Sequence, residues 1–318
     1  MSTVTEPAAG LAGRWVAPFP LNLGSTLGVH RRGRGDPAYL VDEAGAIWRT
    51  SLTPAGPGTL RLTARHAATH EQAGETVVAA TAWGPGAGWL LDQLPVLLGT
   101  LDRPESFRPA HPVLRELAAR HLGWRIGRSG RVLEALVPAV LEQKVVGVEA
   151  RRAWRLLLTR FGAPAPGPGP AGLRVFPPPE VWASLPSWEW HRAGVEAVRA
   201  RTIAAAAGVA GRLEEITTMP SAQADAALQS LPGIGPWTSA EARQRACGDA
   251  DAVSVGDYHL PSLVGWALAG RRTDDAGMLE LLAPYPGHRY RVTRLIEMSG
   301  LAPPRRGPRL AARDYREL

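Results

Sequence analysis

Two patterns of hydrophobic and polar positions divide the chain. Between residues 14 and 100, short and partly alternating segments such as LVDEAGAIWRTSL and GTLRLTARH are separated by Gly, Pro and Asp. Such alternation predicts β-strands with one buried face. The segment TVVAATAWGPGAGWLLDQLPVLLG begins as a strand and ends as a helix, and its glycines at 84–88 predict a turn rather than a nucleotide cradle. Residues 31–36, RRGRGD, predict a solvated turn.

From about residue 105 the pattern becomes helical. Apolar residues recur at helical spacing in HPVLRELAARH and RVLEALVPAVLEQKVV, and again in the segments YHLPSLVGWALAG and RYRVTRLIEMSG. Residues 163–179 contain seven prolines and several glycines. We expect them to form an extended surface connection inside one helical domain, because neither flank alone holds enough chain for the set of motifs described below.

These patterns predict an α+β fold with two domains. Residues 1–104 are expected to form an N-terminal domain of strands with a helix or two. Residues 105–302 are expected to form an all-α domain, and residues 303–318 a basic C-terminal tail. A chain of 318 residues has enough material for two hydrophobic cores.

Composition narrows the function classes. The net charge of +7 suits a polyanionic partner, although the preference for arginine over lysine, with Lys144 as the single lysine, also fits a coding bias. One cysteine excludes an intramolecular disulfide and an all-cysteine metal site, and no histidine pair has metal-ligand spacing. We expect no metal or organic cofactor. The chain shows neither a secretory signal nor an apolar run of about 18 residues, so a cytoplasmic, nucleoid-associated location is expected.

The segment LPGIGPWTS, residues 231–239, carries the first candidate chemistry. It is preceded by a predicted helix, for which Ser221 is a suitable N-cap, and Pro236 suits the first turn of the helix that follows. Gly233 and Gly235 flank one apolar residue, so a hairpin here presents backbone N–H groups outward. Unpaired N–H groups beside a helix N-terminus favour a phosphate, which predicts a phosphate-binding hairpin.

Asp257, 20 positions after Trp237, is the strongest catalytic candidate. As a structural residue it is expected to cap the helix that begins near Tyr258. As a catalytic residue it is placed to stabilise positive charge at an anomeric carbon, or to orient a water for attack there. N-glycosidic cleavage has an oxocarbenium-like transition state that such an anion stabilises. The two roles are compatible, since a cap fixes the direction of the carboxylate.

These motifs resemble those of the helix-hairpin-helix DNA glycosylase superfamily, and within it 3-methyladenine-DNA glycosylase II. LPGIGPWTS is similar to the family hairpin, and the step from Trp237 to Asp257 is similar to the subfamily's spacing to its catalytic aspartate. Glu142-Gln143-Lys144 lies where the family has a helix end and loop facing DNA, and FPLNLGSTL resembles part of the family's N-terminal domain. The resemblance covers most of the chain and is most specific at the hairpin and the aspartate.

The resemblance implies how DNA is held. The N–H groups of Gly233 and Gly235, with the Thr238 hydroxyl, are expected to bind the backbone beside the lesion, while Gln143 and Lys144 fill or flank the vacated base stack. The damaged base is flipped into a pocket between the two halves of the helical domain. Double-stranded DNA is thus the expected partner, and we expect a monomer.

The resemblance also implies a base pocket and a mechanism. Trp237, Tyr258 and His288 are expected to line the pocket. Bifunctional relatives carry a nucleophilic lysine where this chain has Trp237, which favours hydrolysis without strand cleavage. Asp257 is the implied catalytic residue.

Three positions depart from the family pattern. Lys144 stands at the wedge position in place of an apolar side chain, Glu241 replaces a pocket aromatic, and His288 stands where the subfamily has a pocket tryptophan. Aromatic rings favour cationic alkylated purines through cation–π contacts, so the loss of two rings affects which class of damaged base the protein is expected to prefer.

The sequence therefore predicts a monofunctional DNA glycosylase of base-excision repair that acts on damaged bases, with alkylated purines as the expected class. Two alternatives stay open. One is a non-catalytic helix-hairpin-helix protein that binds damaged DNA, and the other is a glycosylase for uncharged oxidised or deaminated bases.

Overall fold

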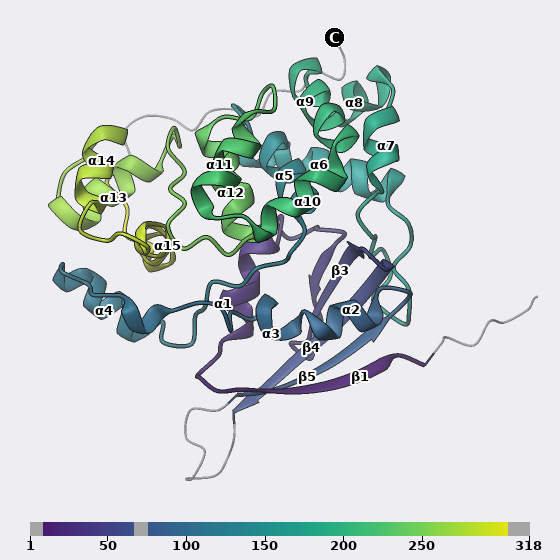
Figure 1. Ribbon diagram of the computed structural model, residues 1–318, viewed down its shortest axis with the longest axis horizontal. Helices are drawn as coiled ribbons and strands as arrows, with labels where there is room; N and C mark the ends of the chain where they lie inside the picture. Colours follow the sequence, from purple (N-terminus) through teal and green to yellow (C-terminus); the bar gives the residue numbers. More distant parts are fainter. Residues whose placement is uncertain (1–8, 67–75, 305–318) are drawn as a thin grey trace, which may run out of the picture.

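The computed structural model describes residues 9–66 and 76–304 of the chain. Figure 1 shows a sheet with helices across one face, a group of helices above it, and a further group to the left. The fold is therefore a mixture of helix and sheet, as the hydrophobic pattern predicts. Residues 305–318, most of the predicted tail, lie outside the described residues. The boundaries at residues 104 and 302 stay predictions.

The sheet contains five antiparallel strands in the order β1-β5-β4-β3-β2. In register, Leu60 lies opposite Ala82 and Leu62 opposite Ala80, so these four apolar side chains share one face. The alternation in the sequence correctly predicts this buried face. The strand bounds are Leu11–Ala17 for β1, Tyr39–Val41 for β2, Ile47–Thr53 for β3, Gly56–His66 for β4 and Thr76–Trp83 for β5.

Two short helices, α2 (Ala87–Asp92) and α3 (Leu94–Leu97), cover this face of the sheet (Figure 1). Leu90, Leu94 and Leu97 pack against the apolar strand residues and are almost completely buried. The predicted turn at residues 84–88 is confirmed, because α2 begins directly after Gly86. The first hundred residues thus enclose their own hydrophobic core.

The opposite face of the sheet carries a stacked pair of tryptophans, Trp48 and Trp83, with ring centroids 5.4 Å apart. The proline-rich segment 163–179 packs over them, and its Leu173 is buried in the same cluster. Gly167 lies so close that a Cβ there would be 2.3 Å from Cγ of Trp83. The segment is therefore more than a surface connection: it joins the helical part of the chain to the sheet.

The helices that follow enclose two separate cores. Helices α5 to α12 surround one, whereas α4 packs with α13, α14 and α15 around the other. The second core thus joins chain segments more than a hundred residues apart. The bounds are Leu23–Leu27 for α1, Pro112–Arg120 for α4, Val132–Leu141 for α5, Gly147–Phe161 for α6, Pro179–Ser184 for α7, Ser187–Ala193 for α8, Ala197–Gly208 for α9, Ala210–Glu215 for α10, Ser221–Gln229 for α11, Pro236–Ala246 for α12, Leu260–Ala269 for α13, Asp275–Leu282 for α14 and Arg289–Ser299 for α15.

Buried polar contacts also connect the sheet part to the helices. The Glu134 carboxylate on α5 accepts hydrogen bonds from the Ser51 hydroxyl and, at 2.6 Å, from the Leu52 N–H of β3. The Asp36 carboxylate accepts one from Nε1 of Trp154 on α6 at 2.8 Å. Residues 31–36 form the predicted turn, with Arg31, Arg34 and Gly35 exposed, but Arg32 and Asp36 are buried, so the turn is solvated only in part. Its glycines let the loop pack against α6.

The packing of the proline-rich segment on the sheet generates a prediction. Gly167 and Gly172 have nearly the same backbone conformation, with φ of 86° and 88°, but a Cβ at Gly172 meets nothing within 4 Å. Gly172→Ala therefore costs only the left-handed backbone strain, about 1–2 kcal/mol. Gly167→Ala adds a clash with Trp83 and is expected to cost roughly 1–3 kcal/mol more, measured by urea unfolding. Equal losses in the two variants would contradict this contact.

Candidate functional site

The segment between α11 and α12 forms the hairpin that the sequence predicts. The N–H of Ile234 donates to the Leu231 carbonyl at 3.1 Å, which closes the turn. Gly233 has a φ of 87°, and a Cβ there would lie 2.1 Å from Oγ1 of Thr202, so a larger residue would be strained and would displace Thr202. A Cβ at Gly235 would meet nothing within 4 Å. One glycine is thus required by the packing, while the other leaves the backbone open.

The backbone N–H groups of this hairpin are available to a ligand. Within the described residues, neither Gly233 nor Gly235 donates its N–H to a hydrogen bond, and both residues are at least partly exposed. They directly precede α12, whose first turn leaves further N–H groups without helical partners. Unpaired N–H groups at a helix N-terminus attract anions, so the hairpin is suited to bind a phosphate.

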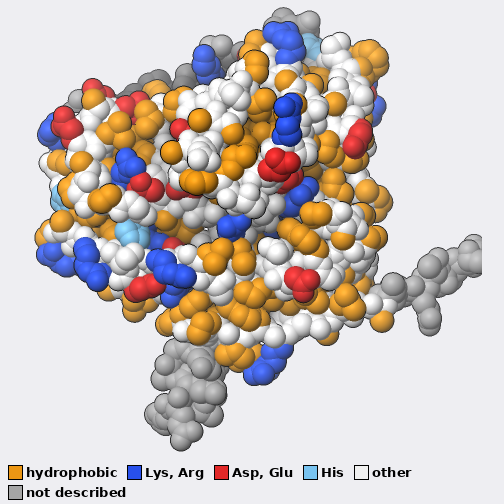
Figure 2. All heavy atoms as spheres, in the orientation of Figure 1, with side chains coloured by type: hydrophobic (Ala, Val, Ile, Leu, Met, Phe, Trp, Pro, Cys, Tyr) orange, Lys and Arg blue, Asp and Glu red, His pale blue; other side chains and the backbone are white. Residues whose placement is uncertain are grey.

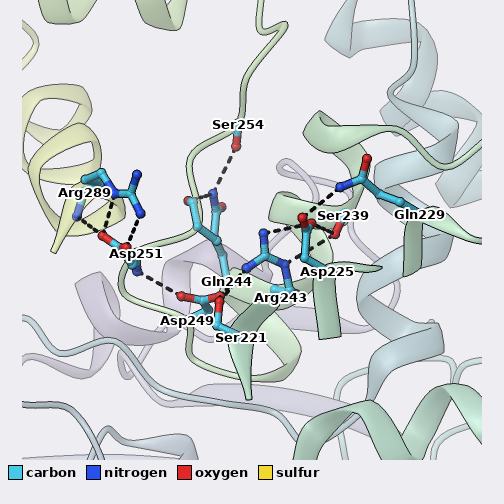
Figure 3. Close-up of polar contacts among 11 residues, drawn as sticks. Ser221, Asp225, Gln229, Ser239, Arg243, Gln244, Asp249, Asp251, Ser254 and Arg289 are labelled. Atoms are coloured by element: carbon cyan, nitrogen blue, oxygen red, sulfur yellow. Dashed lines mark hydrogen bonds and ion pairs between the residues drawn. The ribbon is translucent and has the colours of Figure 1, made fainter. Parts of the chain in front are cut away.

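The buried guanidinium of Arg243 on α12 holds the two hairpin helices together (Figure 3). It donates to Asp225 on α11 at 3.0 Å and to Ser221 at 2.9 Å, and it pairs with Asp249 in the loop after α12. Ser221 is the first residue of α11 and caps nothing, so its predicted capping role is wrong. Its hydroxyl is engaged instead with Arg243 and Asp249.

A second group of contacts fixes the loop that leads to Asp257. The Gln244 side chain on α12 donates to the Ala252 carbonyl at 2.9 Å and to Oγ of Ser254 at 3.0 Å (Figure 3). The Ser254 hydroxyl donates in turn to Glu241 at 2.6 Å. The loop is thus held along α12, which determines where its acidic residue lies.

Asp257 accepts three hydrogen bonds from two directions. Its Oδ2 accepts from Nε1 of Trp237 at 3.0 Å, and its Oδ1 accepts from the N–H groups of His259 and Leu260 at 2.7 and 2.9 Å. Helix α13 begins at Leu260, so the expected capping contact is present although the helix starts later than expected. The 20-residue step from Trp237 therefore corresponds to a direct contact that orients the carboxylate.

The half-buried Asp257 borders a cavity of about 310 Å³ between α12, α13 and α15. Residues from the N-terminal part of the chain and from the loop after α5 complete its wall. Its lining consists of Gly28, Val29, Arg31, Arg32, Glu142, Trp237, Glu241, Gln244, Arg245, Ser254, Asp257, Leu260, Tyr290, Thr293, Arg294 and Glu297. The lining contains two aromatic side chains and is otherwise mainly polar and charged.

Most charges in the cavity wall are paired. Arg32 pairs with Glu142 at 3.2 Å, and Arg245 with Glu241 at 2.7 Å. Arg294 pairs with Glu297 at 3.0 Å.

Burial lowers the pKa of the Arg245 guanidinium, but attraction to Glu241 outweighs it and raises the pKa overall. The guanidinium stays charged. Within the described residues, Asp257 is the carboxylate of the wall that pairs with no cation.

Two buried polar groups in the wall retain free hydrogen-bonding capacity. The Tyr290 side chain is 5% exposed and its hydroxyl has no hydrogen-bond partner among the described residues. Burial raises the pKa of Tyr290 to about 12, so this hydroxyl stays protonated at neutral pH. Gln244 is 4% exposed and uses its Nε2 for the loop, which leaves its Oε1 as an acceptor. Both groups are suited to bind the polar edge of a ligand.

Three of the predicted DNA-binding side chains behave differently from one another. The Gln143 amide donates to the Gly233 carbonyl and to Oγ1 of Thr238, both at 2.9 Å. We expected the Thr238 hydroxyl to contact a phosphate. Thr238 is instead buried, and its hydroxyl supports the hairpin from inside. Lys144 is exposed and, alone among the described non-glycine residues, has a positive φ, 54°. A non-glycine residue keeps this left-handed conformation only where the surrounding structure holds it.

Tyr258 and His288 do not line this cavity, so their expected place in a base pocket stays a prediction. Tyr258 is 82% exposed and packs edge-on against His259. His288 accepts from Nε of Arg291 and bonds the Ser106 hydroxyl at 2.8 Å. Burial and the nearby Arg291 lower the pKa of His288, consistent with a neutral ring in this contact. Of the three predicted pocket side chains, the structure places Trp237 beside Asp257.

Sequence reasoning missed Arg32, Arg245, Tyr290 and Arg294 in the cavity wall. For Glu241 and Arg245, and for Tyr290 and Arg294, a signal existed: the two residues of each pair lie four positions apart, on the same side of a predicted helix. Arg32 gave no such signal, because it comes from a distant loop.

Within the described residues, no three His, Cys, Asp or Glu side chains come together as a metal would need. The same part of the chain contains no helix that is long and apolar enough to span a bilayer.

Comparison with known proteins identifies relatives of this fold. No protein-family model matches. Two curated sequences from Mycobacterium tuberculosis, each named "Probable bifunctional transcriptional activator/DNA repair enzyme AlkA", are 32% identical over 155 residues, or 48% of this chain. The match spans only 30% of each relative.

Solved structures match over more of the chain. The 3-methyladenine DNA-glycosylase from Archaeoglobus fulgidus has a TM-score of 0.72 at 19% identity and covers 90% of this chain and 97% of its own. Clostridium acetobutylicum 8-oxoguanine glycosylase/lyase has a TM-score of 0.67 at 9% identity and covers 92% and 99%. At these identities the likeness shows a shared fold.

The hairpin network predicts a strong dependence on one side chain. Arg243→Met leaves Asp249 buried without a cation and is expected to lower the free energy of unfolding by about 3–5 kcal/mol. Arg289 pairs with Asp251, but its side chain is 40% exposed, whereas the side chain of Arg243 is 9% exposed. Arg289→Met is therefore expected to lower the free energy of unfolding by about 1 kcal/mol or less. Denaturant unfolding of both variants measures the difference. A similar, small loss in both would show that the network is not needed for stability.

Proposed function

Because the chain has the fold of the helix-hairpin-helix DNA glycosylases, we propose that it hydrolyses the N-glycosidic bond of damaged bases in duplex DNA. One observation carries the proposal: the Asp257 carboxylate is held by three hydrogen bonds at the wall of a cavity. A hairpin with free N–H groups precedes it in the chain and contributes Trp237 to the contact. This combination suits base excision after the base has been flipped.

The proposed reaction assigns a role to each group. The N–H groups of Gly233 and Gly235 hold a phosphate, and the damaged base enters the cavity. Asp257 stabilises the positive charge that develops at C1′ and orients the attacking water. As the C1′–N bond breaks, its electron pair leaves with the base, and the water oxygen bonds to C1′ after losing a proton to the carboxylate or to solvent. Trp237 replaces a nucleophilic lysine, so the strand stays intact.

A non-catalytic DNA-damage-binding protein is the main alternative. Such a protein would use the same hairpin and basic surface, and Asp257 would serve only as a helix cap. The hydrogen bond from the Leu260 N–H to Asp257 is consistent with that role. Binding to DNA is expected under both hypotheses, whereas release of a free base belongs to the enzyme alone. As part of the proposal, we expect the protein to act on duplex DNA as a monomer.

A helix-capping aspartate elsewhere provides the matched control. We expect Asp257→Asn to reduce single-turnover base release at least about 100-fold while binding to DNA is retained. Asp274 caps α14 by accepting from the Gly277 N–H at 3.0 Å, and it does not line the cavity. Asn caps helices about as well as Asp, so Asp274→Asn is expected to keep both the stability of the protein and its full base-release activity. Release by the wild type without strand nicks supports the proposal; retained release in Asp257→Asn contradicts the assigned role.

Two classes of damaged base are candidates. Alkylated purines are the class that the sequence predicts, and the name of the Archaeoglobus neighbour includes 3-methyladenine. The cavity wall favours uncharged oxidised or deaminated bases. Its ion pairs leave little net charge to attract a cation, Glu241 replaces an aromatic ring, and Tyr290 and Gln244 offer a donor and an acceptor to a base edge. Cation–π binding of a charged purine has few rings available here.

The second candidate predicts a lesion-dependent effect of one hydroxyl. Tyr290→Phe removes a buried donor, so release of an uncharged base such as hypoxanthine or 8-oxoguanine is expected to slow about tenfold. Release of a cationic 7-methylguanine is expected to be unaffected. Tyr285→Phe serves as the control, since its hydroxyl contacts His111 and lies outside the cavity wall. Faster release of alkylated purines than of neutral lesions by the wild type would support the first candidate instead.

A further inference from the structure

The loop of residues 31–36 and helix α6 bring basic side chains together. A Cβ at Gly33 would lie 2.4 Å from Cδ of Arg151, and one at Gly35 would lie 3.2 Å from a terminal nitrogen of Arg155. Gly33 also has a φ of 88°. The two glycines therefore let the stems of two α6 arginines lie directly against the loop, a packing that a larger residue would prevent.

The loop itself is held rigidly. Asp36 accepts hydrogen bonds from the N–H groups of Arg32 and Ala38 and from Trp154, so the loop closes on itself and attaches to α6. Arg32 points inward and is buried, whereas Arg31 and Arg34 are exposed. A buried carboxylate thus holds the backbone of a loop that carries two exposed arginines.

The result is a local excess of positive charge. Five exposed cations belong to this surface, and the structure shows no salt bridge from any of them to a described acidic residue: Arg31, Arg34, Lys144, Arg151 and Arg155. The guanidinium of Arg151 also lies beside Gly147, three residues after Lys144. Figure 2 shows one face of the molecule, on which basic side chains lie among hydrophobic and acidic ones. Gathered like charges repel one another, so such a surface favours an anionic partner.

This basic surface borders the cavity that contains Asp257. Arg31 is part of the cavity lining, and the neighbouring Gln143 bonds the hairpin that carries Gly233. We propose that the loop 31–36 and α6 form a second phosphate-binding surface, which holds the backbone of duplex DNA beside the cavity mouth. Guanidinium groups bind phosphates in a bidentate manner, and spaced cations match the spaced phosphates of a strand better than one small anion. The identity of the polyanion rests on the proposed function.

The association constant K for DNA falls as the salt concentration rises, and the slope of log K against log[salt] is proportional to the number of phosphate contacts. We choose Arg34→Gln/Arg155→Gln, which keeps most of each side-chain stem, and a duplex that carries a stable abasic-site analogue. Fluorescence anisotropy titrations at several salt concentrations are expected to show a slope reduced by about 1.8, roughly 0.9 for each lost contact. Affinity at low salt is expected to fall at least about tenfold.

Arg14→Gln/Arg120→Gln is the matched control, because it removes the same charge from exposed sites outside the cavity lining. Its slope is expected to stay at the wild-type value. An unchanged slope in the first variant, or an equal reduction in both, overturns the second surface. Base release by the wild type is measured separately. Its absence together with a reduced slope would contradict the proposed activity alone, and its presence with an unchanged slope would contradict the second surface alone.

Discussion

The buried guanidinium of Arg243 is the interaction on which the arrangement of the site depends. It contacts both helices of the hairpin and, through Asp249, the loop that leads to Asp257. A buried ion pair adds little net stability compared with apolar packing, but its geometry is specific because each donor requires an acceptor at a set position. One buried side chain therefore connects the hairpin with the start of the loop that leads to Asp257, and Gln244 and Trp237 complete the placement of the carboxylate.

The cavity is a second consequence of buried charge. Three arginines in its wall each have a carboxylate partner, and burying these charges is acceptable only because they are paired. Pairing also removes most of the net charge that the cavity would present to a ligand. A wall of this kind recognises shape and hydrogen-bonding edges, in contrast to a wall of aromatic rings, which recognises a cationic face.

The N-terminal part of the chain contributes directly to the site. Nε of Arg245 on α12 donates to the Val29 carbonyl at 3.0 Å, and Arg31 and Arg32 form part of the cavity wall. The sheet that supports these residues is attached to the helices by Glu134 and by the proline-rich segment over Trp48 and Trp83. The strands thus position the loop 31–36, and the fold explains why an apparently separate part of the chain lies beside Asp257.

The sequence by itself determined those features that depend on local spacing. Strand alternation, helical periodicity and turn residues predicted most elements, and the motif around Gly233 with Asp257 downstream predicted a hairpin and a carboxylate that the structure joins through Trp237. The family resemblance carried by these motifs also implied that Tyr258, next to Asp257, belongs to a base pocket. Only the tertiary structure showed that Tyr258 faces solvent while Arg32 and Tyr290, far apart in the chain, share a wall. The physical reason is that periodicity tells which face of an element is buried, whereas the partners of buried charges are chosen by packing between distant segments.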